Sequence, residues 1–186
     1  KEERVGGQVN IAARLSDKAW LRWLIEDQER ELRRLGVEIF LDKKATTDSI
    51  SKEDAEIIII ATGAEPNMKK ARILEGKGIP IVTAWNVLHD QWMSDYKTSQ
   101  AIVWGGGRIG CEVAEVLVLQ EQRVTLVTSR ALDQLAGDSD NWLHRKLVKR
   151  IISHPLITFL SEYELTNLIN EKVVVASKKS TEKKYL

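Results

Sequence analysis

A group of glycines between an apolar run and a helical pattern constrains the possible fold of this chain more than any other feature. Residues 100–104, Gln-Ala-Ile-Val-Trp, can form a buried strand, and they lead directly into a Gly-x-Gly-x-x-Gly segment at residues 105–110. A helical pattern runs from residue 108 to about residue 120, and a second apolar strand follows at residues 124–127. This order of strand, glycine turn, helix and strand predicts a βαβ unit with a dinucleotide site.

Each glycine of the turn has a distinct physical role. The first permits the tight turn, the second lets a pyrophosphate approach the backbone, and the third lets the helix pack against its strand. Unpaired N–H groups at the start of the helix then face the phosphates, with the positive end of the helix dipole behind them. The residues expected to bind the pyrophosphate are Gly105, Gly106, Gly107, Arg108, Ile109 and Gly110.

The end of the second strand indicates which dinucleotide binds. An acid there, about 20 residues beyond the first glycine, would accept hydrogen bonds from the adenosine ribose. This chain has Thr128, Ser129 and Arg130 at that place instead. Because an arginine binds phosphate well and a carboxylate would repel it, these three residues favour NADP(H) over NAD(H). NAD(H) stays open as the alternative if Arg130 is only a solvated loop residue.

Composition excludes several classes of protein. The chain has 186 residues, 43% hydrophobic and 30% charged, with a net charge of +1, so we expect neither a nucleic-acid nor a membrane partner. No apolar stretch approaches the ~18 residues of a membrane span. A single cysteine, Cys111, excludes an internal disulfide, a redox pair and a cysteine-built metal or iron–sulfur site. We therefore expect no metal site and a reducing, cytoplasmic setting. No catalytic residue is expected either, because His89 and His154 have no carboxylate or nucleophile at a suitable spacing.

The rest of the chain alternates predicted helices and strands. Ser16 is expected to cap the first helix and Gly36 to end it. The predicted helices are residues 17–35, 86–89 and 141–153, with Leu143, Leu147 and Ile151 as the buried ridge of the last. The predicted strands are residues 37–41, 54–61, 156–160 and 172–176, and a loose polar tail begins at residue 178.

Two features do not fit a free-standing sheet. Residues 57–60 are four consecutive isoleucines, which is typical of a central parallel strand buried on both faces. Residues 1–66 supply only one other strand and one helix to cover it. The loop Gly6-Gly7-Gln8 also has no strand before it. We expect part of a sheet to be absent from this chain.

Several segments in order resemble the nucleotide-binding half of a flavoenzyme family. The family is the NADH:flavin oxidoreductases related to 2,4-dienoyl-CoA reductase and trimethylamine dehydrogenase, and the resemblance spans residues 1 to about 176. In the amine-dehydrogenase branch the second glycine loop is degenerate, whereas here it is intact, which favours the reductase branch. The matching segments are residues 6–12, 35–38, 60–66, 83–88, 105–112 and 141–145.

The resemblance implies an α/β architecture in which a flavin domain is interrupted by a nicotinamide domain. It places a partial FAD-domain segment at residues 1–66, a connector at 67–98, a Rossmann-like NAD(P)-binding domain with a parallel sheet at 99–178, and a tail at 179–186. The first segment is then an incomplete second Rossmann-like domain. The residues implied to line what remains of the flavin site are Gly6, Gly7, Gln8, Ala61, Thr62 and Gly63.

By the same resemblance, this chain is expected to bind a nicotinamide dinucleotide, which Arg130 favours as NADP(H), for hydride transfer to flavin, and to be inactive in isolation. The first FAD glycine loop would precede Lys1, and a later flavin-contacting segment would follow Leu186. FAD is implied for the complete enzyme, FMN and an iron–sulfur cluster only for parts outside this chain, and the remaining domains of the parent flavoenzyme are its expected partners. The alternative is a non-catalytic assembly module that holds ADP or NAD(P) structurally. A disulfide reductase is disfavoured because it needs two cysteines.

Single residues near the glycine turn admit a chemical and a structural interpretation. Cys111 at the helix start could be a reactive thiolate, but packing beside Gly110 is favoured. Glu112 and Glu115 are interpreted as the solvated side of the helix, and His144 as part of a solvated face.

Overall fold

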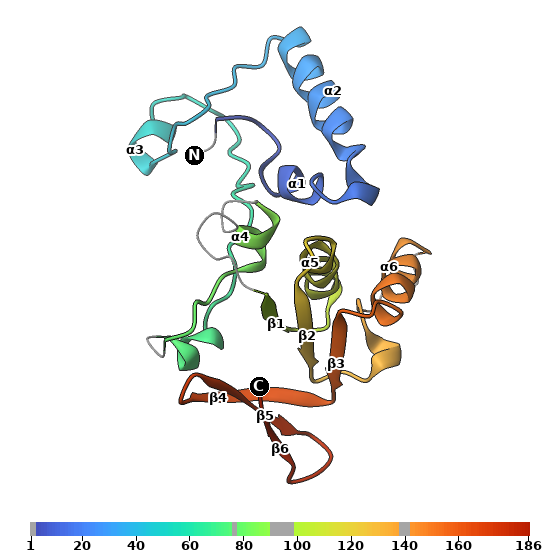
Figure 1. The fold of residues 1–186 in the computed structure, drawn as a ribbon. Coiled ribbons are helices and arrows are strands. Elements are labelled where there is room, and N and C mark those ends of the chain that lie inside the picture. The colour runs from blue at the N-terminus through green and yellow to red at the C-terminus, as the bar shows by residue number, and fades with distance from the viewer. Residues whose placement is uncertain (1–2, 76–77, 90–98, 138–141) are drawn as a thin grey trace. The chain divides into compact units, whose positions relative to one another are not determined.

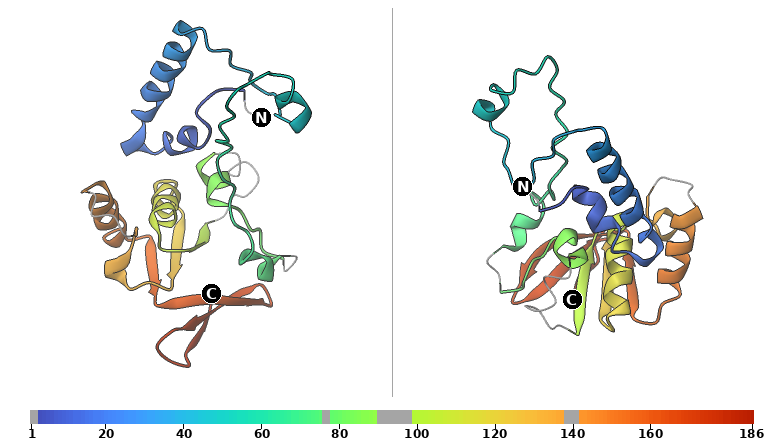
Figure 2. Two further views of the ribbon diagram at one scale, coloured as in Figure 1. Left: turned by 180° about the vertical axis from the view of Figure 1, so that it is seen from behind. Right: turned by 90° about the horizontal axis from the view of Figure 1, so that it is seen from above.

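The computed structural model describes residues 3–75, 78–89, 99–137 and 142–186. The chain divides into two compact units, Lys1–Glu65 and Pro66–Leu186 (Figures 1 and 2). All the β-strands that the structure describes lie in the second unit. The two units are described one after the other.

The first unit is built from short helices and irregular segments. The longest helix, α2, begins at Leu21 with Trp20 as its N-cap, so the predicted start after Ser16 is four residues too early. Its predicted end is confirmed: Gly36 takes a φ of +72°, and the Val37 amide donates to the Leu32 carbonyl at 3.0 Å. The helices are α1 (Gly7–Ala12), η1 (Ser16–Lys18), α2 (Leu21–Arg34) and α3 (Thr47–Ile50).

The two strands predicted in this unit do not form. Residues 37–41 and 54–61 are irregular, and the side chains of Ile57, Ile58, Ile59 and Ile60 are 58–85% exposed. A strand is stable only when neighbouring strands satisfy its backbone N–H and C=O groups. No described residue of the first unit is in a strand, so the isoleucine run has nothing to pair with and the strand prediction was wrong.

A three-stranded parallel sheet organises the second unit. The strands lie in the order β1–β2–β3, with register pairs Val103 to Leu126 and Leu126 to Phe159. Helix α5 packs on β1 and β2, and α6 packs against α5 (Figure 1). This confirms the predicted α/β class. The elements are β1 (Gln100–Trp104), α5 (Arg108–Leu119), β2 (Arg123–Thr128), η3 (Leu132–Gln134), α6 (Trp142–Ile152) and β3 (Ile157–Ser161).

The predicted ridge of α6 is confirmed where the structure describes it. Leu147 and Ile151 are 3% and 1% exposed. The side chain of Leu143, and the Asp138-Ser139-Asp140 segment that leads into the helix, lie outside the described residues.

A second, antiparallel sheet covers the other face of the parallel one. Its strands are β4 (Tyr163–Ile169), β5 (Lys172–Ser177) and β6 (Lys183–Tyr185) in that order. The two sheets meet in one apolar cluster that contains Val127, Leu165, Leu168, Val173 and Val175. Neither β4 nor β6 was predicted, and the tail after residue 178 is not loose, because β6 pairs with β5.

The segment between the units folds with the second one. Residues Ala71–Leu74 form a 3₁₀ helix, η2, whose Leu74 joins the apolar cluster between the sheets. Residues Ala84–Leu88 form α4, two residues before the predicted start. Thr83 and Asn86 make a reciprocal capping box at its first turn.

Candidate functional site

The glycine turn is shaped by a very close approach of two backbones. Gly105 has a φ of +124°, and its amide donates to the Val127 carbonyl at 2.9 Å. A Cβ on Gly110 would lie 1.9 Å from the Gly105 carbonyl oxygen. The first and third glycines therefore serve the turn and the packing of α5 on β1, as predicted from their spacing.

Gly107 faces open space at the start of α5. A Cβ at this position would have no atom within 4 Å. Gly107 is the N-cap with extended backbone, φ −72° and ψ 177°, and no side chain caps the helix. The first helical bond runs from the Cys111 amide to the Gly107 carbonyl, so the amides of residues 108–110 have no partner within the helix. Such an uncapped start with room beside it is suited to a phosphate.

Gly106 links the turn to the end of β2. A Cβ here would lie 2.5 Å from the Thr128 hydroxyl oxygen, and the Gly106 carbonyl accepts from the Ala136 amide at 2.9 Å. Thr128 is 2% exposed, and its hydroxyl accepts a hydrogen bond from the Arg130 amide at 3.1 Å. Thr128 thus fixes the conformation of the segment that follows the strand.

Ser129 and Arg130 leave the sheet at its carboxyl edge. Ser129 is exposed and Arg130 is half-buried. The Arg130 guanidinium Nη1 donates to the Gln134 carbonyl at 3.5 Å, which holds it beside the η3 turn. The structure therefore brings Thr128 to Arg130 next to the glycine turn.

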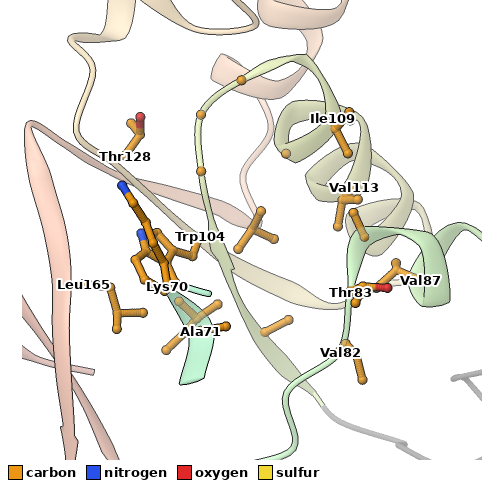
Figure 3. A pocket seen from close by; sticks show the side chains of 18 of the residues that line it. Lys70, Ala71, Val82, Thr83, Val87, Trp104, Ile109, Val113, Thr128 and Leu165 are labelled. Carbon is orange, nitrogen blue, oxygen red and sulfur yellow. The ribbon is translucent and has the colours of Figure 1, made fainter. Parts of the chain in front are cut away.

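A cavity of about 1370 Å³ in the second unit connects these parts (Figure 3). Its walls include all six residues of the glycine turn and Thr128, Ser129 and Arg130. The connector closes it with residues 66–68, 70–71, 74 and 79–84. Among the described residues that line it, the charged ones are Lys70, Arg108, Arg130 and Glu164, so basic groups dominate.

The connector wall was missed by the sequence analysis. No turn motif or periodicity marks Lys70 or its neighbours as part of a site. The packing of Leu74, with Ile79 and Ile81, against the apolar cluster brings this segment to the cavity, and a single sequence holds no local signal for those contacts.

The acids on α5 are not solvated, contrary to the sequence interpretation. Glu112 is 7% exposed, with a carboxylate oxygen 3.7 Å from Arg108 Nε. Arg108 Nη1 also lies 3.5 Å from His144 Nε2, so His144 is part of this group rather than of an open face. Glu115 is paired with Arg150 of α6. Each of these two carboxylates of α5 has a basic partner, on α5 itself or on α6. Removing a carboxylate from water without such a partner is costly.

Cys111 is a packing residue. Its side chain is fully buried and its Sγ lies 3.7 Å from the Gly106 carbonyl oxygen. Burial raises the pKa of the Cys111 thiol to about 11. The thiol is therefore protonated at neutral pH, and the structural interpretation is confirmed.

Two of the expected flavin-site segments make contact within the first unit. Gly6 and Gly7 both take positive φ values, 104° and 42°. The Gln8 side-chain amide donates to the Ala64 carbonyl at 3.1 Å, which joins the start of α1 to the residue after Gly63. A Cβ on Gly63 would lie 3.3 Å from Gln8 Nε2, and its φ is +75°.

Comparison with known proteins gives the family. A family described as pyridine nucleotide-disulphide oxidoreductase matches residues 18–185. The chain belongs to this family. Membership implies binding of FAD and of a nicotinamide dinucleotide, and it agrees with the resemblance found in the sequence.

Two curated relatives of this chain are much longer proteins. It is 34% identical to an NADH oxidase from Thermoanaerobacter brockii over 127 residues, 68% of this chain and 19% of that protein. It is 26% identical to a bilirubin reductase from Mediterraneibacter gnavus over 183 residues, 98% of this chain and 26% of that protein. The chain thus spans about a fifth to a quarter of these relatives.

Two solved structures share the fold over the whole chain. A 2-naphthoyl-CoA reductase superposes with a TM-score of 0.76 at 19% identity, on 27% of its own chain. A histamine dehydrogenase from Rhizobium sp. 4-9 superposes with a TM-score of 0.77 at 16% identity, on 29% of its own chain. Both support the architecture of the pyridine nucleotide-disulphide oxidoreductase family.

Within the residues that the structure describes, none of the helices combines the length and apolar character needed to cross a membrane. Across the same residues, histidines, cysteines and acids do not gather in groups of three or more that could hold a metal ion.

Proposed function

We propose that this chain is the nucleotide-binding portion of a flavin-dependent NAD(P)H oxidoreductase and that it binds NADP(H). The observation that carries the proposal is the open space at Gly107, at the uncapped start of α5. This space opens on a cavity whose far wall is the end of β2, where Arg130 stands in place of an acid.

The cavity offers a separate binding group to the pyrophosphate and to the 2′-phosphate of NADP(H). The backbone amides of residues 108–110 would bind the pyrophosphate, and Gly107 leaves it room to approach. The Arg130 guanidinium would bind the 2′-phosphate, while a carboxylate at the same place would repel it. When bound, the nicotinamide supplies a hydride to a flavin. The role of this chain is to bind and orient the dinucleotide.

The complete enzyme would then reduce its substrate through the flavin. The two curated relatives bear the names of an oxidase and a reductase, in keeping with such chemistry. The remaining domains of the parent flavoenzyme would be the partners of this chain. The name of the Thermoanaerobacter protein specifies NADH, so the choice of NADP(H) here depends on Arg130 and is the part that most needs a test.

A second candidate is a nucleotide-binding module without catalysis. The observation that favours it is the state of the first unit, the one expected to contact flavin. There residues 57–60 are exposed and the described residues form no sheet. Under both candidates the isolated chain is inactive and is purified without flavin. A yellow preparation that oxidises NADPH would contradict that shared expectation.

The nucleotide choice is tested by titrating the chain with NADPH and NADH while tryptophan fluorescence is followed. Trp104 ends β1 immediately before Gly105 and serves as a reporter. We expect NADPH to bind at least about tenfold more tightly, since a charge-assisted hydrogen bond contributes about 1.5–3 kcal/mol.

Arg130→Gln is expected to weaken this preference and leave NADH binding unchanged. Arg123→Gln, at the opposite end of β2, is the matched control and should change neither affinity. Equal binding of both nucleotides by the unmodified chain would refute the choice of NADP(H). Binding of neither nucleotide would refute the site itself.

A further inference from the structure

The connector brings a basic side chain to the nucleotide cavity from outside the βαβ unit. Lys70 is the N-cap residue of η2, and the Ala71 amide donates to the Met68 carbonyl at 2.9 Å. Leu74 at the other end of η2 is 7% exposed and packs in the cluster that contains Val127 and Leu165. Lys70 is therefore carried by an element that is anchored to both sheets.

The side chain of Lys70 points into the cavity. In Figure 3 it extends with its amine toward Thr128, at the carboxyl end of β2. In a dinucleotide-binding unit the adenosine ribose lies at this end of the second strand. Among the described residues, Lys70 has no ion pair or side-chain hydrogen bond that would turn its charge away from the cavity.

The charge of the expected ligand requires more than one cation. A phosphate monoester carries about −1.5 to −2 charges near neutral pH. Arg130 supplies one positive charge, and part of its hydrogen-bonding capacity is used by the Gln134 carbonyl. Arg108 is engaged with Glu112 and His144 at the glycine turn. Besides Arg130 itself, Lys70 is the cation lining the cavity that Figure 3 shows directed toward the end of β2.

We propose that Lys70 is a second ligand of the adenosine 2′-phosphate and that it acts with Arg130 to select NADP(H). This inference rests on the proposed function and extends its site to the connector. The two residues have complementary roles: Arg130 offers a planar fork with fixed geometry, and Lys70 offers a compact charge on a flexible stem. Nucleotide choice is then set partly by a segment that lies before the first strand of the βαβ unit.

Lys70→Met tests the proposal, with Lys69→Met as the matched control. Lys69 and Lys70 are both exposed, but Lys69 does not line the cavity. Dissociation constants for NADPH and NADH are measured by calorimetry on the full 186-residue chain, and circular dichroism checks that each variant is folded. We expect Lys70→Met to raise the NADPH constant about tenfold and the NADH constant less than twofold. Lys69→Met should change neither, and Lys70→Arg should keep most of the NADPH affinity.

The alternative outcomes separate the inference from the function on which it rests. If Lys70→Met weakens NADPH and NADH equally, Lys70 contacts the shared pyrophosphate and the proposed selectivity role is overturned. If Arg130→Gln weakens NADPH and Lys70→Met does not, the proposed function stands and the Lys70 inference fails. If the unmodified chain does not prefer NADPH, both fail.

Discussion

Replacing Gly110 and Gly107 separately with alanine distinguishes the packing role of the glycine turn from its binding role. At Gly110, the new Cβ would lie 1.9 Å from the Gly105 carbonyl oxygen, and real Cβ contacts essentially never fall below 3.0 Å. Because both sides of this contact are backbone, α5 and β1 must move apart by about 1 Å. Overpacking of this kind costs up to about 3 kcal/mol.

The helical preference of alanine offsets part of that cost. An alanine in a helix is favoured over glycine by up to about 1 kcal/mol. With the full 3 kcal/mol for the overpacking, the net loss for Gly110→Ala is about 2 kcal/mol, which lowers the melting temperature of a chain of this size by about 4–8 °C. At Gly107 no atom lies within 4 Å of the new Cβ, and alanine as an N-cap costs less than about 1 kcal/mol.

The assay is a thermal melt of both variants, followed by a titration with NADPH. Gly107→Ala should melt within about 4 °C of the unmodified chain. Its methyl group would stand where the pyrophosphate approaches, so its affinity for NADPH should fall at least about tenfold, a loss of about 1.4 kcal/mol. A Gly110→Ala variant that melts normally would refute the packing argument. A Gly107→Ala variant that binds NADPH normally would refute the placement of the pyrophosphate.

Three further expectations concern the rest of the chain. The pKa of the Cys111 thiol is raised from 9.0 to about 11, so stability is fully present below pH 9 and is lost as the pH rises toward 11. Urea unfolding of Cys111→Ala should lack this loss, and equal pH profiles would contradict it. Arg150→Met removes the partner of Glu115, which is 14% exposed, and should cost about 1 kcal/mol in urea unfolding, whereas the exposed Lys149→Met should cost almost nothing. Trp23 is 75% exposed, so acrylamide should quench its emission; Trp23→Phe should lower the quenchable fraction, and an unquenchable spectrum would rule out this exposure.

The βαβ unit could be predicted almost to the residue. Its strand, turn, helix and second strand follow one another along the chain, so the partners that stabilise each element are its neighbours in sequence. The glycine spacing also defines the turn, and the structure assigns to Gly105 and Gly110 the roles that the spacing predicts.

The antiparallel sheet could not be predicted, for reasons visible in its backbone. A register shift between Leu165 and Asn167 breaks the alternation of apolar and polar residues along β4, although Leu165 and Leu168 are both buried. The hairpin turn is formed by Asn170 and Glu171 with φ values of 50° and 60°, and it contains no glycine to mark it.

The remaining predictions failed where the structure depends on contacts between residues that are far apart in the sequence. Residues 57–60 have the composition of a strand, but strand formation depends on partners that the described part of this unit does not provide. Likewise, the place of Lys70 beside the nucleotide cavity depends on Leu74 reaching the space between two sheets. Composition and spacing describe local preference, and neither contains these distant contacts.

The four isoleucines also set a practical limit on handling the chain. A short run of β-branched residues without charge, proline or glycine is the type of segment that stacks into cross-β assemblies when it is accessible. With Ile57, Ile59 and Ile60 each at least 79% exposed, copies of the chain can meet through this run in concentrated solution. Aggregation through this run, more than the free energy of unfolding, would then determine how long a sample stays in solution.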